Sequence, residues 1–426
     1  MKIMVVGGGG REHAVVKKLK ENPRVTEIYV LPGNSGIARD AVCVPIGAKD
    51  IPAIVNFAKE KKIDYAVVTP DDPLVLGAVD ELQKIGVPCF GPDKKAAVLE
   101  GSKVFSKNLM KKYGIPTAAY ETFDDLSAAL AYLGECDIPV VVKADGLALG
   151  KGVTVAFTRA QAEEAVRSMM ADKVFGESGA HVVIEEYLEG PEVSVLSFTD
   201  GKTVVPMVSS MDHKRARDGD EGANTGGMGT VAPNPFYTEE IAEECMEKIF
   251  LPTVAAMNAE GRTFRGCLYF GLMLTKDGPK VIEYNCRFGD PETQVVLPLL
   301  KTDLLTVMQA VTEGKLGERK VEFSDLSAAC VVMASDGYPA KYRTGYPISL
   351  PEAIAGDVCF AGVKTGEDGQ LLTAGGRVLG AVAVAGTTEE ALKQAYGKVG
   401  QIAFENAYYR RDIGKRALAE IRRKGN

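Results

Sequence analysis

Short apolar runs and helical patterns alternate over the first hundred residues. The apolar runs are bounded by turn residues and are typical of buried strands, whereas the segments between them place apolar side chains on one helical face. The predicted strands are Lys2–Val6, Glu27–Leu31, Asp64–Val68 and Cys89–Phe90, and the predicted helices are Arg11–Lys20, Ile51–Lys61 and Leu74–Ile85. Alternating strands and helices predict a doubly wound, parallel α/β sheet, whose ligands lie at the carboxyl ends of the strands.

The pattern changes after Gly101. A helix is predicted over 102–113, a long helical stretch over 239–260, and a β-hairpin around the turn Asp277-Gly278. Further strands are predicted at Pro139–Lys143, Val153–Phe157, Val182–Tyr187, Val193–Asp200, Thr203–Met207, Cys267–Thr275 and Lys280–Asn285. This mixture indicates an α+β region of about 220 residues in two lobes.

A smaller α+β unit is predicted from about residue 327 onward. Its strands are Ala328–Ala334 and Arg377–Ala385. Thr387 and Glu390 form a possible capping box for the helix that follows. The basic segment Arg410–Lys424 is interpreted as a solvated terminal helix rather than a binding patch. We therefore expect three domains: 1–101, 102–326 and 327–426.

Composition narrows the class of protein. The 426 residues carry 50 Lys and Arg against 57 Asp and Glu, a net charge of −7, which argues against a protein that chiefly coats nucleic acid. No apolar run approaches the roughly 20 residues of a membrane helix, and glycine follows the first strand too soon for a secretory signal. The eight cysteines form no C-x-x-C pair and the three histidines do not flank them, so neither zinc nor disulfides are expected. A cytoplasmic protein with reduced thiols is the natural interpretation.

Glycine is the unusual component, with 46 residues in short clusters between periodic segments. Gly7–Gly10 follows the first strand and opens a helix, so its amides can face an anion at the helix N-terminus. In a dinucleotide fingerprint the third glycine would fall on Glu12, and no acid ends the second strand, which disfavours NAD. A phosphate or phosphoribosyl group fits better, with Arg11 as a counter-charge. The alternative is a tight turn that packs the helix on the strand.

The strongest phosphate signal is the loop Lys143–Gly152. Lys143 ends an apolar strand, a glycine-rich loop that contains Lys151 follows, and another strand begins. Glycine amides can surround phosphate oxygens and the two lysines can neutralise them. The strand–loop–strand order and the absence of G-K-[ST] exclude a Walker A loop. The alternative is a surface hairpin with charged tips.

Two further strand ends carry candidate ligands. The backbone of Glu185–Leu188 could read an adenine edge and Glu192 could reach ribose hydroxyls, although charged residues at strand ends are usually solvated. Spacing by two residues puts Glu283 and Asn285 on one strand face, and oxygen ligands suit Mg²⁺. The paired strand Gly271–Thr275 offers no third acid, so nucleotide phosphates would have to complete the coordination sphere.

The segment Arg287–Glu292 combines a helix start with an unexplained charge. Asp290 as N-cap, followed by proline at the first helical position, accounts for the helix start. It does not account for Arg287, whose guanidinium could stabilise a transferring phosphoryl group. Upstream, Asp212–Arg215 and Asn224–Gly229 bracket a polar loop. This loop offers cations and turn amides for a small carboxylate, or else is a solvated charge run.

Together these motifs resemble the glycinamide ribonucleotide synthetase family of the ATP-grasp superfamily over essentially the whole chain. The most specific match is the octapeptide Arg287–Gln294, and Gly7–Ala14 resembles the family's G-x-G-G-R-E-H-A. The other matching segments are Pro32–Asn34, Glu100–Lys103, Lys143–Gly152, Asp212–Arg215, Asn224–Gly229, Gly337–Pro339 and Gly375–Leu379. The resemblance implies a Rossmann-like amino-terminal domain, a two-lobed ATP-grasp core with a mobile lobe at about 120–190, and a small α+β carboxyl-terminal domain.

The resemblance also implies ligands for this chain. It implies Mg²⁺ or Mn²⁺ at Glu283 and Asn285, and catalytic roles for Lys214, Arg287 and Asp290. The implied ATP site consists of Lys103, Lys143, Asp145, Gly146, Gly150, Lys151, Gly152, Glu185, Glu186, Tyr187, Leu188 and Glu192. The implied sites for glycine and 5-phosphoribosylamine consist of Gly9, Gly10, Arg11, Glu12, Asn34, Asp71, Asp212, Lys214, Asn224, Thr225, Gly226, Gly227 and Arg287.

The implied reaction joins glycine to 5-phosphoribosylamine with ATP, through glycyl phosphate, in de novo purine biosynthesis. Its products are glycinamide ribonucleotide, ADP and phosphate. Two departures concern the amine substrate, because Thr69-Pro70-Asp71 replaces the usual Gly-Pro-Glu and Gly8 stands where a polar residue is common. The alternatives are a different ATP-grasp ligase and a nucleotide-binding protein without turnover. No nucleic acid or membrane partner is expected, and the chain is expected to be a monomer or a weak homodimer.

Overall fold

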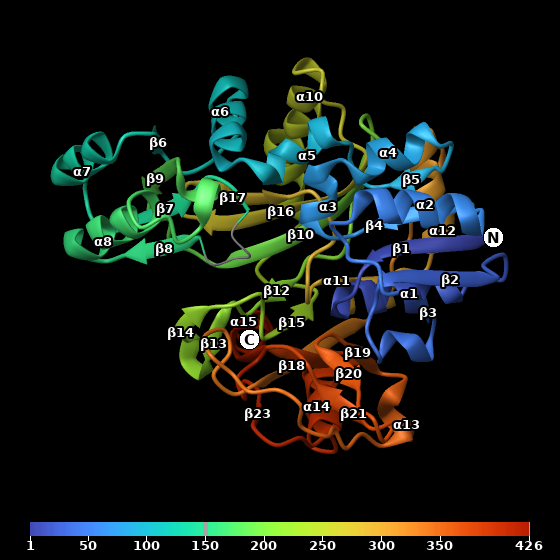
Figure 1. Cartoon of the computed structure of the whole chain (residues 1–426). Helices are drawn as coiled ribbons and strands as arrows, with labels where there is room; N and C mark the ends of the chain where they lie inside the picture. The colour runs from blue at the N-terminus through green and yellow to red at the C-terminus, as the bar shows by residue number, and fades with distance from the viewer. Residues whose placement is uncertain (148–151, 426) are drawn as a thin grey trace.

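The amino-terminal part of the chain forms a five-stranded parallel sheet. The computed structural model describes residues 1–147 and 152–425, and the strand order of this first sheet is β3-β2-β1-β4-β5 (Figure 1). Its strands are β1 (Lys2–Gly7), β2 (Glu27–Pro32), β3 (Val42–Cys43), β4 (Tyr65–Val68) and β5 (Cys89–Phe90), with helices α1 (Gly10–Lys20), α2 (Ile51–Lys61), α3 (Asp71–Leu76) and α4 (Ala78–Lys84). All four pairings are parallel, so the predicted doubly wound sheet is confirmed.

The prediction of one helix over 74–85 is wrong. The chain forms α3 and α4 instead, because Gly77 takes a left-handed φ of +94° and ends α3. Helix α3 also begins earlier than predicted, so Asp71 and Asp72 lie in its first turn, where the helix dipole favours negative charge.

A four-stranded antiparallel sheet, here called the lobe sheet, has the order β6-β9-β7-β8. Its elements are β6 (Tyr120–Phe123), α7 (Leu126–Glu135), β7 (Val140–Ala144), β8 (Val153–Ala156), α8 (Arg159–Met170) and β9 (Val182–Glu186). Successive side chains of β7 point to opposite faces of the lobe sheet. Val140 and Val142 pack with α7 and α8, whereas Val141 lines a cavity on the other face. Strand β6 and the two helices are absent from the sequence predictions.

A second antiparallel sheet, here called the core sheet, has the order β11-β10-β16-β17. The strands are β10 (Glu192–Thr199), β11 (Val204–Pro206), β16 (Gly266–Thr275) and β17 (Gly278–Asn285), and the helices beside them are α5 (Lys94–Gly101), α6 (Lys103–Tyr113), α9 (Glu239–Cys245) and α10 (Leu251–Ala259). The predicted hairpin at Asp277-Gly278 joins β16 to β17 and is confirmed. The predicted helical stretch over 239–260 is also present, with a π-helical turn at Met246–Phe250 between α9 and α10.

The last sheet joins strands from two distant parts of the chain. Its order is β12-β15-β18-β22-β19, and β23 (Ala407–Tyr408) also pairs with β18. The strands are β12 (Met211–Asp212), β15 (Gly229–Ala232), β18 (Ser327–Ser335), β19 (Val358–Phe360) and β22 (Arg377–Ala385). Since β12 and β15 precede residue 327, this sheet fastens the polar loop after β12 to the carboxyl-terminal part of the chain.

Short elements complete this carboxyl-terminal part. They are the hairpins β13 (Arg215–Arg217) with β14 (Glu221–Asn224) and β20 (Val363–Thr365) with β21 (Leu371–Thr373), and the helices α11 (Thr293–Val296), α12 (Leu304–Glu313), α13 (Glu352–Ala355), α14 (Thr388–Val399) and α15 (Lys415–Gly425). Thr387 caps α14 by accepting from the amide of Glu390 at 3.2 Å, whereas the Glu390 carboxylate accepts from Gln394. Thr387 therefore supplies the predicted cap, and the described contacts of Glu390 do not include the reciprocal half of the box.

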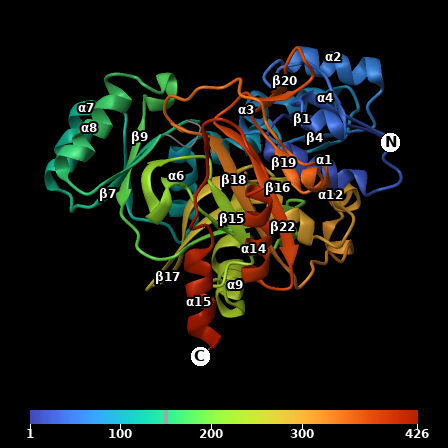
Figure 2. The ribbon, with the colours of Figure 1, turned by 90° about the horizontal axis from the view of Figure 1, so that it is seen from below.

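The sheets surround a common centre. From below, the lobe sheet with α7 and α8 lies on the side opposite the first sheet, and the carboxyl-terminal sheet lies between them (Figure 2). Among the described residues, no helix combines the length and the apolar character that crossing a bilayer requires.

Candidate active site

A cavity of about 880 Å³ is lined by residues of the lobe sheet, the core sheet and both ends of the chain. Apolar side chains from both antiparallel sheets share its wall with charged groups. The apolar lining includes Val141, Val155, Val183, Leu188, Met273 and Ile282. A cavity of this size, with an apolar wall and a few convergent charges, suits a ligand as large as a nucleotide.

Most of the site residues expected from the sequence line this cavity. They are Arg11, Asp71, Lys103, Lys143, Gly152, Glu185, Glu186, Tyr187, Leu188, Glu192, Asp212, Lys214, Asn224, Thr225, Gly226, Glu283, Asn285, Arg287 and Asp290. Gly9, Gly10, Glu12, Asn34, Asp145, Gly146 and Gly227 lie outside its lining. Gly150 and Lys151 lie outside the residues that the structure describes.

Three buried charged side chains from α6, β7 and β9 form a cluster at the cavity wall. The Glu185 carboxylate pairs with the ammonium groups of both Lys107 and Lys143. Lys143 also donates to the carbonyl of Ile282 at 3.0 Å, which ties the lobe sheet to the core sheet. Lys103 donates to the carbonyl of Gly146 at 3.0 Å, and burial lowers the pKa of Lys103. The ammonium groups of Lys103 and Lys143 can neutralise phosphate oxygens.

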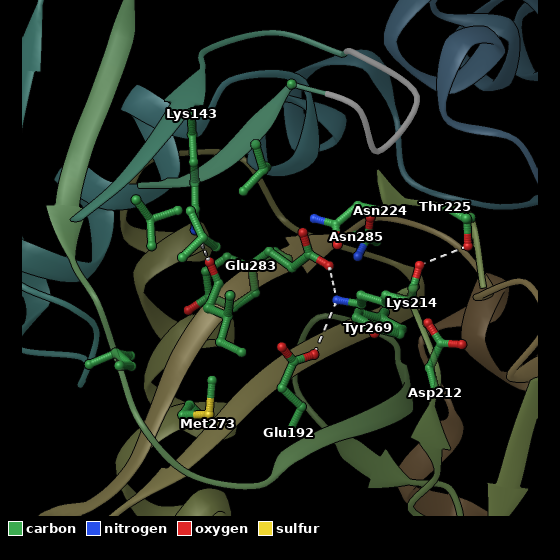
Figure 3. A pocket seen from close by; sticks show the side chains of 18 of the residues that line it. Lys143, Glu192, Asp212, Lys214, Asn224, Thr225, Tyr269, Met273, Glu283 and Asn285 are labelled. Atoms are coloured by element: carbon green, nitrogen blue, oxygen red, sulfur yellow. Dashed lines mark hydrogen bonds and ion pairs between the residues drawn. The ribbon is translucent and has the colours of Figure 1, made fainter. Parts of the chain in front are cut away.

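The charged pocket around Lys214 lies at the ends of β10 and β17 (Figure 3). The Lys214 Nζ atom is 3.3 Å from Glu283 Oε1 and 3.5 Å from Glu192 Oε2. Lys214, more than any other group, lowers the pKa of Glu283 to about 2, so this carboxylate stays charged over the whole physiological range. The pocket therefore holds a stable negative charge on Glu283 that is balanced by the Lys214 ammonium group.

Glu283 and Asn285 offer oxygen ligands on one face of β17. They lie opposite Gly271 and Tyr269 of β16, so the paired strand provides no third acid, as predicted. Within residues 1–147 and 152–425 there is also no group of three His, Cys, Asp or Glu side chains placed to hold a metal. One carboxylate and one amide oxygen fit a hard cation such as Mg²⁺ that takes its other ligands from phosphates and water.

Arg287 lies next to this oxygen pair. Its guanidinium forms an ion pair with Glu100 at 2.9 Å and donates to Asn285 Oδ1 at 2.9 Å. Although burial opposes the charge, Glu100 and Asp71 hold the pKa of Arg287 above its ordinary value. The Nε atom of Arg287 is buried and has no hydrogen-bond partner among the described residues, and the Arg287 side chain lines the cavity.

Two further carboxyl groups, those of half-buried Asp212 and buried Glu292, interact with Lys214 and with each other. Burial and the charge of Glu292 raise the pKa of Asp212 well above its ordinary value. Burial likewise raises the pKa of Glu292, which accepts a long hydrogen bond from Ser194 at 3.4 Å. Two desolvated carboxylates near each other are stabilised by a cation between them.

Arg377 and Tyr338 come from the carboxyl-terminal part of the chain and hold the polar loop. Arg377 donates to the carbonyls of Gly226 and Asp290, each at 2.8 Å, and its guanidinium is 3.3 Å from the Asp290 carboxylate. The Tyr338 hydroxyl accepts from the Gly226 amide at 3.0 Å. Burial opposes the charge of Asp290, but Arg377 and Arg11 hold the pKa of Asp290 below its ordinary value.

The prediction that Asp290 caps a helix is wrong. The helix α11 begins at Thr293, and its N-cap is Glu292. The Asp290 carboxylate instead accepts from the side chain of Gln294 at 2.7 Å and pairs with Arg377. These contacts hold the octapeptide between the cavity and the first sheet.

The glycine-rich turn after β1 is occupied by internal contacts. Glu12 accepts from the Gly9 amide at 2.6 Å, from Arg11 at 2.6 Å and from the Thr69 hydroxyl at 2.7 Å. A side chain on Gly10 would collide with Gln294. Asn34 donates to the carbonyls of Gly8 and Phe360. The turn thus packs the helix on the strand, and only Arg11 of this group reaches the cavity.

The remaining expected residues hold loops or line the cavity mouth. Asp145 accepts from Ser102 Oγ at 2.9 Å and from the Val104 amide at 2.8 Å, which fixes the start of α6. Glu186 pairs with Lys280 at 2.9 Å, and the Tyr187 ring packs edge-on against Phe157. The Thr225 hydroxyl donates to the carbonyl of Lys214 at 2.8 Å.

Several cavity residues are not among the sequence predictions. They are Glu100, Lys107, Tyr269, Glu292, Tyr338, Arg377 and Arg416. Lys107 sits four residues after Lys103 on the predicted helix, and that spacing is the one local signal that points to it. Arg377 opens a predicted strand, and nothing local indicates that it reaches a loop 150 residues earlier.

Comparison with known proteins decides the family. Sequence models of phosphoribosylglycinamide synthetase match the chain in order: the N domain over residues 1–100, the ATP-grasp (A) domain over 101–293 and the C domain over 328–416. The chain belongs to the phosphoribosylglycinamide synthetase family. This is the family that the motifs indicate, so that prediction is confirmed.

Relatives of this family match along their full length. The phosphoribosylamine–glycine ligase of Caldanaerobacter subterraneus subsp. tengcongensis is 50% identical over 414 residues, which cover 97% of this chain and 99% of the relative. The enzyme of the same name from Escherichia coli K12 is 47% identical over 424 residues, with coverage of 98% and 99%.

Solved structures support the same architecture. The crystal structure of phosphoribosylamine–glycine ligase from Thermotoga maritima has a TM-score of 0.86 and 34% identity, and the match covers 97% of this chain and all of that one. The biotin carboxylase domain of 2-oxoglutarate carboxylase from Hydrogenobacter thermophilus, solved with MgADP, has a TM-score of 0.74 at 16% identity, over 96% of this chain and 91% of that one. The chain therefore has the α/β and α+β multidomain fold with an ATP-grasp core.

Proposed function

We propose that the protein ligates glycine to 5-phosphoribosylamine, with ATP converted to ADP and phosphate, in de novo purine biosynthesis. The observation that carries this proposal is the match of about half of all residues, along the full chain, to proteins named phosphoribosylamine–glycine ligase. The family segments cover residues 1–100, 101–293 and 328–416, which supports boundaries near 101 and 327. We propose domains of 1–101, 102–326 and 327–426, with a mobile lobe at about 120–190.

ATP binds between the lobe sheet and the core sheet. Valines of β7, β8 and β9 on one side, and Met273 and Ile282 on the other, supply an apolar slot for adenine. Lys103 and Lys143 lie beside this slot and bind phosphate oxygens. The Glu185 carboxylate is paired with Lys107 and Lys143. The hydrogen bonds to the adenine edge therefore come from the backbone of the residues that follow Glu185.

Glu283 and Asn285 hold the divalent cation that accompanies ATP. The MgADP in the structurally similar biotin carboxylase domain supports Mg²⁺, and Mn²⁺ suits the same oxygen ligands. A bound cation at this position offsets the charge that develops on the phosphates. Arg287 adds its guanidinium charge on the same side of the cavity, where the γ-phosphoryl group transfers.

Glycine binds near Lys214. Its ammonium group fits the carboxylates of Asp212 and Glu292, whose charge is destabilised without a cation. Its carboxylate then faces Lys214 and Arg287. A side chain on Gly227 would collide with Asp212 and Pro291, so glycine at this position keeps the Asp212 carboxylate in place. Arg377 and Tyr338 keep the Gly226 backbone in place for this purpose.

The chemistry proceeds through an acyl phosphate. A carboxylate is a poor electrophile, because its charge repels an amine and its leaving group would be oxide. A glycine carboxylate oxygen attacks the γ-phosphorus, the bond to ADP breaks, and glycyl phosphate forms. The amine of phosphoribosylamine attacks the carbonyl, phosphate leaves, and an amide results. Closure of the lobe excludes water, which would otherwise hydrolyse the intermediate.

A coupled assay of ADP release, with each substrate omitted in turn, tests this function. ADP release that needs both glycine and phosphoribosylamine supports it, whereas release with a different acceptor or none refutes it. We also propose that the protein works in the cytoplasm, as a monomer or a weak homodimer, which sedimentation over a range of concentrations tests.

A further inference from the structure

Lys107 is a buried lysine that the ATP site described above does not use. It lies on α6, one helical turn after Lys103, and its side chain is 3% exposed. Its ammonium group pairs with Glu185, donates to the Thr117 hydroxyl at 2.8 Å and lies 5.4 Å from the centre of the Tyr120 ring. The described contacts of the Lys107 ammonium group are thus all with the lobe sheet or with the segment that leads into it.

The charges around Glu185 do not cancel. One carboxylate lies between two ammonium groups, those of Lys107 and Lys143, so the buried cluster carries a net charge of +1. Burial lowers the pKa of Lys107 to about 8, and the charge of Glu185 opposes that effect, so Lys107 remains mostly charged at neutral pH. The other charged or titratable groups that face Lys107 are Lys143 on β7, Glu186 on β9 and Tyr120 on β6.

This arrangement decides how strongly Lys143 is held. A buried ion pair with a single partner is tight, because each charge depends on the other for solvation. Without Lys107, the Glu185 carboxylate would be balanced by Lys143 alone and would compete with a phosphate for it. With Lys107 present, Glu185 already has a partner, and the charge of Lys143 is available to a ligand.

We infer that Lys107 is a positioning residue for the nucleotide: it neutralises Glu185 and thereby frees Lys143 to bind phosphate. The inference deepens the proposed function and rests on the ATP site assigned there. Neighbouring contacts connect the lobe sheet to the core sheet: the Thr117 hydroxyl donates to the carbonyl of Val281 at 2.7 Å, and Lys143 donates to the carbonyl of Ile282 on the same strand. Lys107 therefore connects Glu185 of the lobe sheet, through Thr117, to β17.

The test is a charge cycle at two positions. Lys107→Met keeps the apolar stem and removes the charge, and it is expected to weaken ADP binding and to raise KM for ATP by about 10- to 100-fold, with kcat at saturating ATP little changed. The double variant Lys107→Met with Glu185→Gln removes both charges, and it is expected to recover most of the ADP affinity. Dissociation constants come from calorimetric titration with ADP, and kinetic constants from the coupled assay.

Lys111→Met is the matched control, since Lys111 is exposed on the same helix and contacts the same Tyr120 ring. Its ADP affinity should equal that of the wild type. Unchanged ADP binding in Lys107→Met, or a double variant that binds more weakly than the single one, would overturn the inference. If Lys107→Met does not fold, the double variant provides the test. An ADP affinity near the wild-type value would support the inference, and a loss of ADP affinity would overturn it.

Failure of this inference can be distinguished from failure of the proposed function. ADP binding is measured without glycine or phosphoribosylamine, so it reports on Lys107 whatever the acceptor is. A wild-type protein that binds ADP but releases none from ATP in the presence of both substrates would refute the function and leave this inference standing.

Discussion

Replacing Glu283 by Gln should change nucleotide binding and turnover in opposite directions. Lys214 lies 3.3 Å from the carboxylate, and Lys143 and Lys103 also favour its charge. Glutamine keeps the shape and the oxygen ligand but removes one negative charge from the surroundings of these three ammonium groups. The cavity becomes more positive, so a nucleotide without metal binds more tightly, whereas the divalent cation loses its only charged protein ligand on β17.

The structure gives the size of the first effect. The fall in the pKa of Glu283 from 4.5 to about 2 corresponds to about 3 kcal/mol of interaction with these cations. The side chain is 34% exposed, so solvent screening is expected to reduce this to about 1.5 kcal/mol, which is a tenfold change in affinity. The loss of the metal's charged ligand should lower turnover by about 100-fold or more.

The assay separates the two effects. Calorimetric titration with ADP in the presence of a chelator measures binding without metal, and the coupled assay at saturating Mg²⁺ measures turnover. Asp277→Asn, at the exposed turn of the same hairpin, is the matched control and should change neither quantity. Weaker metal-free binding in Glu283→Gln, or turnover close to the wild-type value, would refute the reasoning.

Three further predictions concern other parts of the molecule. Arg377→Gln should lower kcat/KM for glycine by about 10- to 100-fold and leave ADP affinity unchanged, because the carbonyls of Gly226 and Asp290 lose the charged donor that holds the polar loop. Equal losses of kcat/KM and of ADP affinity would contradict this. Burial lowers the pKa of His213 from 6.5 to about 4. Between pH 6.5 and pH 4 this imidazole is therefore protonated in the unfolded chain and neutral in the folded protein. The free energy of unfolding should therefore fall by about 3 kcal/mol as pH drops from 6.5 to 4, and His213→Asn should remove this part of the slope in urea titrations; an unchanged slope counts against it. With glycine labelled by ¹⁸O in its carboxylate, one label per turnover should appear in the released phosphate, and unlabelled phosphate would exclude glycyl phosphate.

Local patterns predict the parts of the site that a single strand or turn defines. The two-residue spacing of Glu283 and Asn285 is a property of any strand, so their common face follows from the sequence alone. The strand–loop–strand order around Lys143 is equally local. The hairpin at Asp277-Gly278 brings β16 opposite both of these proposed ligands, so the lack of a third acid on the paired strand is also predictable.

Contacts between distant segments are not visible in such patterns. Arg377 reaches Gly226 because β15 and β22 flank β18 in one sheet, and no periodicity indicates that pairing. Glu12 looks like a free acid beside a glycine loop, but it is buried against Thr69 of a neighbouring strand end. Lys107 reads as part of an ordinary amphipathic helix, because its partner Glu185 is fixed only when the lobe sheet folds over α6.

The geometry around residues 283–287 carries the whole account. A crystal structure of the protein with Mg²⁺, glycine and a non-hydrolysable ATP analogue tests it most directly. The account predicts a cation bound to the side-chain oxygens of Glu283 and Asn285, and a γ-phosphate between that cation and Arg287. A γ-phosphate out of contact with these three side chains would contradict it.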